Sequence, residues 1–445
     1  MGSTSKHDGG IVQVTSSVSR DVKTPPVMGS METVAPQATS STLKNANSPR
    51  APYLPSRETL KDLGPELITA SVYKTAKSSQ STVPSRRPLT TLEVGTTITH
   101  KAGRWKVMRN IATGPFSDVF LVCDADNKKR KYAMKCERVE GNQRPVLKLD
   151  VLVLMSVKGS VGFPLFIAAG RTKIYRYCVM QLVGPDLGKL RRSLVAKRFS
   201  VPTALRVLQQ TLRRLEVLHD AGWLCRDVKA PNFAIGLGQE NGVVYMLDFG
   251  FARKFKDANG VIYPPREAAA LLGTFQYTSL ASHGHRDQSP KDDLESWFYM
   301  AAELLKGPLP WSKIDGHKEH KTIMARKLSI RAEGRAEFMC GMPDEFDIIL
   351  SMIDQMGFFE RPQYQLIHSL IDQAAEKLDI TLHEPLDWQQ NARVLRKAEF
   401  VGELGESNLA SMKMGEGGED GPENEYSSDS TPLDIENSTK VTLKH

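Results

Sequence analysis

Short apolar or alternating runs are separated by turn residues in the first part of the central region of the chain. A period of two, broken by Gly, Asp and Asn, is typical of antiparallel strands joined by tight turns. The predicted strands cover residues 105–111, 118–123, 130–136 and 177–182. Residues 146–157 differ, because their apolar positions recur with a helical period. The pattern therefore predicts an antiparallel sheet that one helix interrupts.

Helical periodicity dominates from about residue 200 onward. Leucines recur three and four residues apart between 205 and 218, behind Ser200 as a candidate N-cap and Pro202 in the first turn. The same signal returns in residues 293–305, 345–356 and 363–378. A strand-rich part followed by a helix-rich part indicates the α+β class.

The two ends of the chain lack such periods. Residues 1–97 are rich in Ser, Thr, Pro and Gly, whereas residues 403–445 are acidic and rich in Gly. Segments of this composition bury too little apolar surface to offset the entropy lost on ordering. We therefore expect two disordered tails around one domain at residues 98–400.

Composition excludes several classes of protein. The chain has 445 residues, of which 40% are hydrophobic, so it can bury a large core. No apolar run approaches the roughly 18 residues that a membrane helix needs, and the first 30 residues lack the apolar centre of a secretory signal. The five cysteines are scattered without a Cys-x-x-Cys pair. We expect a cytoplasmic monomer that contacts no membrane and has no disulfides.

A cluster of reactive residue types follows the long predicted helix. Asp227, Lys229 and Asn232 lie two and three residues apart, and Asp248 later opens an Asp-Phe-Gly sequence after an apolar run. An aspartate can orient an attacking hydroxyl, a lysine can neutralise a transferred phosphoryl group, and carboxylate or amide oxygens can bind magnesium. Either motif alone is most simply a turn, but chance would rarely supply both in this order.

Two upstream segments are candidates for binding nucleotide phosphates. Gly114 is the middle glycine of a Gly-x-Gly-x-x-Gly pattern in which Ala112 and Ser117 replace the other two glycines. On its own, this segment is equally well explained as an ordinary turn between strands. The sequence Tyr-Ala-Met-Lys at 132–135 places Lys135 on an apolar strand, where its ammonium could pair with phosphate, although a lone strand lysine is usually solvated.

Taken together, these motifs resemble those of protein kinases of the casein kinase 1 superfamily. The resemblance lies in the segments KAPNFA (229–234), GTFQY (273–277), DDLES (292–296) and LPW (309–311). VMQL (179–182), PPR (264–266) and WFYM (297–300) are most similar to the tau-tubulin kinase branch and its divergent nematode relatives. The resemblance covers about residues 101–390. It implies a bilobal protein kinase fold, with a small antiparallel-sheet N-lobe that has one helix (101–183) and a larger helical C-lobe (184–390).

The resemblance also implies the activity, which is transfer of the γ-phosphate of ATP to protein serine or threonine with Mg²⁺, or alternatively Mn²⁺. Asp227 then resembles the catalytic aspartate, Asn232 and Asp248 resemble the metal ligands, and Lys229 and Thr274 fit a Ser/Thr acceptor. Asp293 resembles a buried aspartate that holds the catalytic loop through its backbone. The implied ATP contacts are Ile111, Gly114, Val119, Ala133, Lys135, Asp150, Met180 as gatekeeper, and the hinge residues Gln181, Leu182 and Val183.

Two departures from the family leave a second interpretation open. Asp150 stands where the family has a glutamate, so its ion pair with Lys135 requires the helix to move inward. The glycine-poor loop restricts how closely backbone amides approach phosphate. These features favour a pseudokinase scaffold or binding protein as the alternative. The retained Lys135, Asp227, Asn232 and Asp248 favour the enzyme.

Charge bears on partners, because the formal net charge of +8 coexists with an acidic C-terminal tail. A basic domain attracts acidic or already phosphorylated protein substrates, with Arg266 as the candidate anion contact. The acidic stretch 423–430 could occupy the same cleft in cis. Residues 251–273 contain no Ser or Thr, so we expect activity without phosphorylation of this segment. The basic run 128–131 is most simply a solvated hairpin tip, with a nuclear address as the alternative, and nucleic-acid binding is unsupported.

Overall fold

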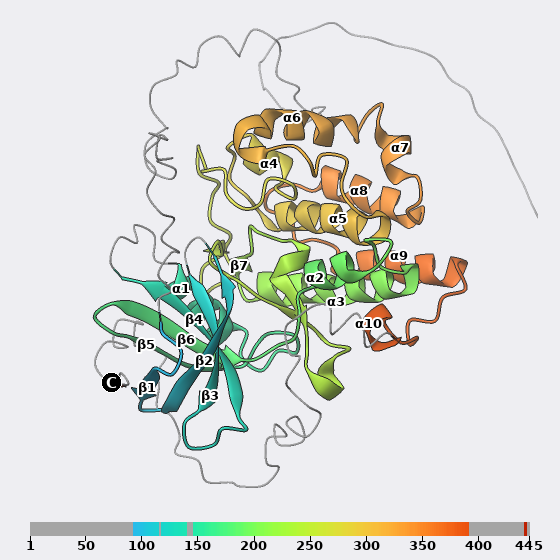
Figure 1. The fold of residues 1–445 in the computed structure, drawn as a ribbon. Coiled ribbons are helices and arrows are strands. Elements are labelled where there is room, and N and C mark those ends of the chain that lie inside the picture. The colour runs from blue at the N-terminus through green and yellow to red at the C-terminus, as the bar shows by residue number, and fades with distance from the viewer. Residues whose placement is uncertain (1–91, 115–116, 140–145, 391–439, 443–445) are drawn as a thin grey trace, which may run out of the picture. The chain divides into compact units, whose positions relative to one another are not determined.

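The computed structural model describes residues 92–114, 117–139, 146–390 and 440–442. Within these ranges the chain forms a strand-rich N-lobe followed by a helix-rich C-lobe (Figure 1). The predicted α+β class and the bilobal arrangement are therefore confirmed. In the part of the chain so described, no helix is long and apolar enough to cross a membrane.

The N-lobe is built on one antiparallel sheet with the strand order β11-β1-β2-β3-β4-β6-β5. The central strands alternate inward and outward side chains, and Phe120, Val122, Met134 and Val179 are buried together in its apolar core. The strands are β1 (Thr97–His100), β2 (Gly103–Thr113), β3 (Asp118–Asp124), β4 (Lys131–Arg138), β5 (Phe166–Arg171), β6 (Tyr175–Gln181) and β11 (Lys440–Thr442). Four of these strands and the intervening helix α1 (Leu147–Ser156) match the predicted segments.

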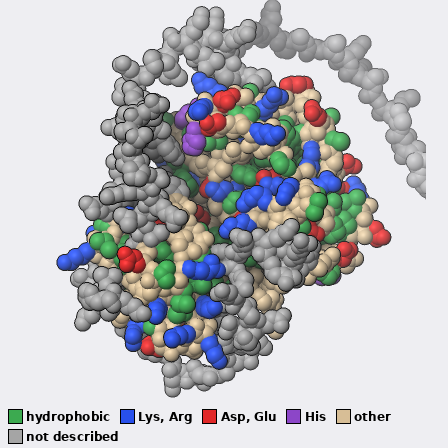
Figure 2. All heavy atoms as spheres, in the orientation of Figure 1, with side chains coloured by type: hydrophobic (Ala, Val, Ile, Leu, Met, Phe, Trp, Pro, Cys, Tyr) green, Lys and Arg blue, Asp and Glu red, His purple; other side chains and the backbone are tan. Residues whose placement is uncertain are grey.

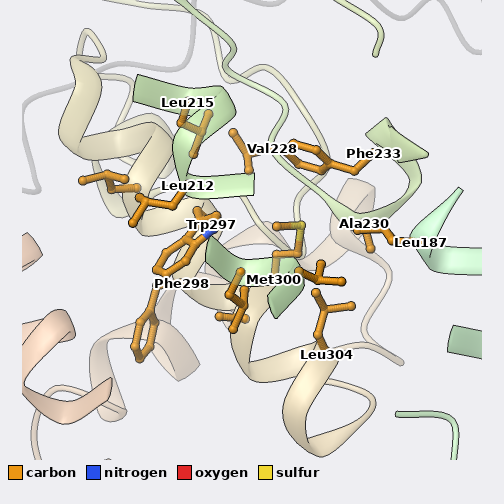
Figure 3. Packing of buried hydrophobic residues seen from close by; sticks show 14 of the residues in the cluster. Leu187, Leu212, Leu215, Val228, Ala230, Phe233, Trp297, Phe298, Met300 and Leu304 are labelled. Carbon is orange, nitrogen blue, oxygen red and sulfur yellow. The ribbon is translucent and has the colours of Figure 1, made fainter. Parts of the chain in front are cut away.

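The C-lobe is organised around two buried helices, α3 (Val201–Asp220) and α5 (Pro290–Lys306). Ser200 accepts a hydrogen bond from the backbone of Thr203, as expected of an N-cap. Trp297 of α5 donates to Thr211 of α3, and Figure 3 shows Trp297 beside Leu212. The other helices are α2 (Leu187–Ser193), α4 (Leu280–His283), α6 (Gly316–Ser329), α7 (Arg335–Met339), α8 (Glu345–Gln355), α9 (Tyr364–Lys377) and α10 (Asp387–Gln390).

Two segments that were predicted to lie in the tails pair with the N-lobe. Leu92 is buried in the N-lobe core, and the amide of Gly95 donates to the carbonyl of Val107. The domain therefore starts before residue 98, because an apolar anchor and backbone pairing offset the cost of ordering these residues. At the other end, β11 pairs with β1 through residues 440–442, since the backbone groups of an edge strand are available for pairing. The rest of the predicted acidic tail lies outside the described residues.

The cysteines are reduced and mostly inaccessible. Cys123, Cys136, Cys178 and Cys225 are buried, whereas Cys340 at the end of α7 is exposed. Burial raises the pKa of the Cys136, Cys178 and Cys225 thiols. These three thiols are therefore neutral at physiological pH.

Candidate active site

The loop that carries Asp227 follows the short strand β7 (Trp223–Leu224) and is held by hydrogen bonds to helix α5. The carboxylate of Asp293 accepts hydrogen bonds from the amides of Cys225 (2.7 Å) and Arg226 (2.8 Å). It also lies 2.9 Å from Nε2 of His219. Arg226 adopts a left-handed φ of 63°, a conformation that such anchoring must sustain. The backbone contact expected of Asp293 is thus present.

Asp227 lies at the centre of a polar network that fixes its carboxylate. Its Oδ1 accepts from the Thr274 hydroxyl (2.8 Å) and from the Thr274 amide (2.9 Å). Its Oδ2 is 2.7 Å from Nζ of Lys229 and accepts from Nδ2 of Asn232 (3.2 Å). Lys229 also donates to the Thr274 hydroxyl (2.7 Å). The structure therefore brings together four residues that the sequence places in two distant segments, and it gives the aspartate one defined orientation.

Gly273 permits this close approach of the two segments. Its φ is 93°, and a Cβ at this position would lie 2.7 Å from the carbonyl oxygen of Arg226. Any other residue would be strained in its backbone and would push Thr274 away from Asp227. The glycine is a local requirement of the site.

Lys135 of β4 forms the second polar centre. Its Nζ is 2.7 Å from Oδ2 of Asp150 on α1 and 2.9 Å from Oδ1 of Asp248. The other oxygen of Asp150 accepts from the amide of Phe249 at 2.9 Å. The shorter aspartate side chain therefore reaches the lysine, and it also ties α1 to the Asp-Phe-Gly turn, in which Asp248 has a left-handed φ of 59°.

Glu137 explains how the shorter side chain of Asp150 can reach Lys135. It is fully buried, two residues beyond Lys135 on the same strand, and its Oε2 accepts from the amides of Val146 and Leu147, both at 2.8 Å. Because these are the first free amides of α1, the carboxylate fixes the start of the helix to strand β4. Sequence reasoning missed Glu137; its spacing of two from Lys135 on the strand, which puts both side chains on one face, was the available signal.

The electrostatics favour a charged Lys135 beside an ionised Asp248, whereas burial raises the pKa of the Asp150 carboxyl. Burial disfavours the ammonium of Lys135, but the carboxylates of Asp150 and Asp248 prevail and raise its pKa. Loss of hydration disfavours the charge on Asp248, yet the neighbouring Lys135 lowers the pKa of its carboxyl. The lysine is therefore positively charged and Asp248 negatively charged at neutral pH.

Asn232 and Asp248 offer oxygen atoms that suit a hard cation. Asn232 donates through Nδ2 to the carbonyl and carboxylate of Asp227, which leaves its side-chain oxygen as an acceptor. The side chain of Asp248 is 52% exposed, so it is open to a ligand. Both offer oxygen donors, the type that Mg²⁺ and Mn²⁺ prefer. Among the described residues, no group of three or more His, Cys, Asp or Glu side chains is placed to hold a metal ion.

Several of the predicted ATP contacts gather in one small apolar cluster, which N-lobe residues form together with Leu237 of the C-lobe. Ile111, Val119, Ala133 and Met180 pack together there, and Ala133 pairs directly with Met180 across the β4–β6 ladder. Sequence reasoning missed further members of this cluster, namely Leu121 and Leu237.

Among the predicted hinge residues, Leu182 belongs to this apolar cluster, whereas Gln181 and Val183 have partners outside it. Gln181 turns its amide toward Tyr245 and Glu240 (both 3.3 Å), and Val183 packs with Ala234 and Tyr245, so these two could meet a nucleotide only through their backbone. The amide of Gly114 donates to the carbonyl of Ser117 at 2.8 Å. Residues 115 and 116 of the phosphate-loop candidate lie outside the described ranges.

Arg266 is already engaged by a carboxylate. Its guanidinium Nη2 lies 2.9 Å from Oδ1 of Asp287, and its amide donates to Oδ2 at 3.0 Å. Arg253 contacts the same carboxylate. Burial works against the charge on Asp287, but the two arginines prevail and lower its pKa. The candidate anion site is therefore a cluster of two arginines around one internal aspartate.

Comparison with known proteins gives the same family from an independent direction. The family described as Protein kinase domain matches residues 105–378. The Caenorhabditis elegans protein named serine/threonine-protein kinase spe-6 is 61% identical over 325 residues, which are 72% of this chain and 86% of that protein. A Dictyostelium discoideum protein, named as a probable serine/threonine-protein kinase, is 33% identical over 288 residues, 64% of this chain and 57% of that protein. The chain therefore belongs to the protein kinase family and is, by homology, a serine/threonine protein kinase.

Proposed function

We propose that this chain is an active kinase of the casein kinase 1 type, which transfers the γ-phosphate of Mg-ATP to serine or threonine of acidic or pre-phosphorylated proteins. The observation that carries the proposal is the network around Asp227. Its carboxylate is oriented by Thr274 and flanked by Lys229, so it can align a small hydroxyl beside a counter-charge for the phosphoryl group. The KAPNFA and GTFQY segments that form this network support the casein kinase 1 branch.

Nucleotide and metal would be held by residues of both lobes. The apolar cluster of Ile111, Ala133 and Met180 offers a surface for the adenine ring. Asn232 and Asp248 would hold Mg²⁺, or Mn²⁺, which when bound neutralises charge on the phosphates. Lys135 lies 2.9 Å from Asp248 and would exchange part of that contact for a phosphate oxygen.

Two contacts support an enzyme over a pseudokinase scaffold. The ion pair between Lys135 and Asp150 forms at 2.7 Å despite the shorter side chain. The bond from the Phe249 amide to Asp150 holds the Asp-Phe-Gly turn with Asp248 next to the lysine. The scaffold remains the alternative function, because of the glycine-poor phosphate loop.

One assay tests the activity. We would measure phosphate incorporation from labelled ATP and Mg²⁺ into casein, comparing the wild type with Asp227→Asn and Asp248→Asn. Transfer by the wild type alone is the expected result. A folded wild-type protein that phosphorylates neither casein nor primed peptides would overturn the proposal in favour of a scaffold.

The preference for acidic substrates is proposed from charge. Figure 2 shows Lys and Arg side chains gathered in the middle of the viewed face. Arg253, Arg266 and Asp287 together carry one net positive charge, and the side chain of Arg266 is 46% exposed. An incoming phosphate would share both arginines with Asp287. Arg266→Ala should raise KM for an acidic peptide more than for a neutral one, while the neighbouring exposed Arg286→Ala should not; equal effects would contradict this role.

The same cluster supports activity without phosphorylation of segment 251–273. Asp287 supplies an internal negative charge to two arginines of that segment, and residues 251–273 contain no Ser or Thr acceptor. Phosphatase treatment should therefore leave transfer to casein unchanged, and abolition of activity would refute the idea.

The remaining proposals concern partners and location. We propose that the acidic stretch 423–430, which lies outside the described residues, occupies the substrate cleft in cis. Deleting this stretch should alter the turnover of added substrate. We also retain a cytoplasmic monomer. The basic run 128–131 lies at the hairpin between β3 and β4, with 128–130 exposed, and a nuclear location is the alternative.

A further inference from the structure

A buried lysine lies on the far side of the segment that holds Asp227. Lys327 of α6 is fully buried, and its Nζ donates to the carbonyl oxygens of Phe275 (2.8 Å) and Thr278 (2.6 Å). The same Nζ is 3.2 Å from Nε2 of His283. An ammonium has three N–H donors, and three acceptors surround this one. The mechanism described above does not use Lys327.

The contacts of Lys327 offset part of the cost of burying its amino group. Nζ lies 4.7 Å from the ring centroid of Tyr299 and 5.8 Å from that of Trp311, so two aromatic rings face the cation. Burial lowers the pKa of Lys327 itself. Burial and the nearby lysine lower the pKa of His283 to about 3, so this histidine is neutral and can accept. The two carbonyls, the histidine nitrogen and the rings therefore give the N–H groups of Lys327 partners and offset part of the cost of burial.

The two carbonyls belong to a tight turn that begins at Thr274. The amides of Tyr277 (2.8 Å) and Thr278 (3.1 Å) both donate to the Thr274 carbonyl. The hydroxyl and amide of Thr274 are the groups that orient Asp227. Helix α6 also contacts this turn at its first residue, where a Cβ on Gly316 would lie 2.5 Å from Cβ of Phe275. Both ends of α6 therefore rest on residues that follow Thr274.

We propose that Lys327 is a positioning residue for phosphoryl transfer, which clamps the turn at 275–278 and thereby holds Thr274 against Asp227. This inference rests on the proposed kinase activity. Without the ammonium, two buried carbonyls lose their donor, and the turn can satisfy them only by shifting. Asp227 would then adopt its productive orientation less often. The contacts of the N-lobe with nucleotide are remote from this change.

The test compares Lys327→Met with Lys321→Met, which removes an exposed lysine from the same helix. We expect Lys327→Met to lower kcat for casein about tenfold or more while KM for ATP stays within about twofold, because two buried hydrogen bonds are lost on the acceptor side only. Lys321→Met should behave as the wild type. In a Thr274→Val background the loss caused by Lys327→Met should shrink, since both residues act through one contact.

Several outcomes overturn the inference. These are an unchanged kcat in folded Lys327→Met, a parallel loss of nucleotide affinity, or a loss that is fully additive with Thr274→Val. If Lys327→Met does not fold, Lys327→Gln, which keeps two donors, is judged by the same criteria. If the wild type itself transfers no phosphate, the proposed function fails separately. Amide hydrogen exchange at 275–279 then still tests the clamp, because unchanged exchange relative to Lys321→Met refutes it.

Discussion

Replacing Asp150 by asparagine should disable the contact between the lysine and helix α1 without changing the volume of the side chain. One carboxylate oxygen of Asp150 accepts from Lys135 at 2.7 Å, and the other accepts from the Phe249 amide at 2.9 Å. An asparagine has only one acceptor oxygen, so its NH₂ group must face one of these two donors in either orientation. The substitution therefore removes one hydrogen bond, either to the Lys135 ammonium or to the buried Phe249 amide. At that position the NH₂ group of asparagine faces another N–H donor.

The magnitude follows from this geometry. A hydrogen bond that involves a charged group contributes about 1.5 to 3 kcal/mol. If that free energy is lost only from the arrangement that binds ATP productively, kcat/KM for ATP should fall about 10- to 150-fold. The Asp150→Glu substitution should also lower kcat/KM for ATP, because an added methylene does not fit between contacts of 2.7 and 2.9 Å.

The assay is steady-state phosphate transfer to casein at varied ATP, with thermal melting as a control for folding. Asp126→Asn is the matched control, because this carboxylate of the N-lobe is exposed and pairs only at the surface, with Arg104. It should leave kcat/KM unchanged. A folded Asp150→Asn protein with kcat/KM within about twofold of the wild type would refute the reasoning.

Three further predictions follow from other contacts. Thr274→Val should lower kcat about tenfold through loss of the hydroxyl that donates to Asp227, whereas Thr274→Ser should stay within a few-fold; equal kinetics for the two variants would contradict the role of the hydroxyl. Asp293→Asn should lower the free energy of unfolding by about 3 kcal/mol in urea titrations, since the buried carboxylate serves three donors; a change below about 0.5 kcal/mol would argue against this anchor. The pKa of His283 is lowered to about 3 in the folded protein. Between pH 7 and pH 5 this histidine therefore binds a proton in the unfolded chain but stays neutral in the folded protein, and the free energy of unfolding falls by about 2 kcal/mol. The His283→Gln variant should not show this part of the fall in the free energy of unfolding. An equal pH dependence of stability in the variant and the wild type would exclude the contribution of His283.

The sequence predicted the elements whose periods are strong. The leucine period of α3 and its Ser200 cap are visible in the sequence because this helix buries one regular apolar face. The residues around Asp227 could be named because each carries a recognisable chemistry at a short spacing. Their mutual contacts could not be predicted, since Asp227 and Thr274 meet only through the positive φ of Gly273.

Other parts of the fold carry no such signal. Helix α6 buries only Gly316, Ile323 and Lys327, so its sequence shows no apolar face. From the sequence alone, Lys327 would therefore be predicted to lie on the surface. Glu137 likewise reads as an exposed strand residue, although it accepts from two amides of α1 and pairs with Arg176. Buried polar residues of this kind depend on partners from other elements, which a single sequence does not reveal.

The burial of the thiols has a practical consequence for studying the protein in solution. Cys178 pairs with Lys135 across the ladder, and Cys225 stands just before the catalytic loop, but both are buried neutral thiols that react slowly with alkylating reagents. Among the five cysteines, Cys340 alone is exposed. A maleimide dye should therefore attach at one natural position on the C-lobe, at a residue that takes no part in the proposed nucleotide and substrate contacts. The unmutated chain thus provides its own site for a fluorescent reporter of ligand binding.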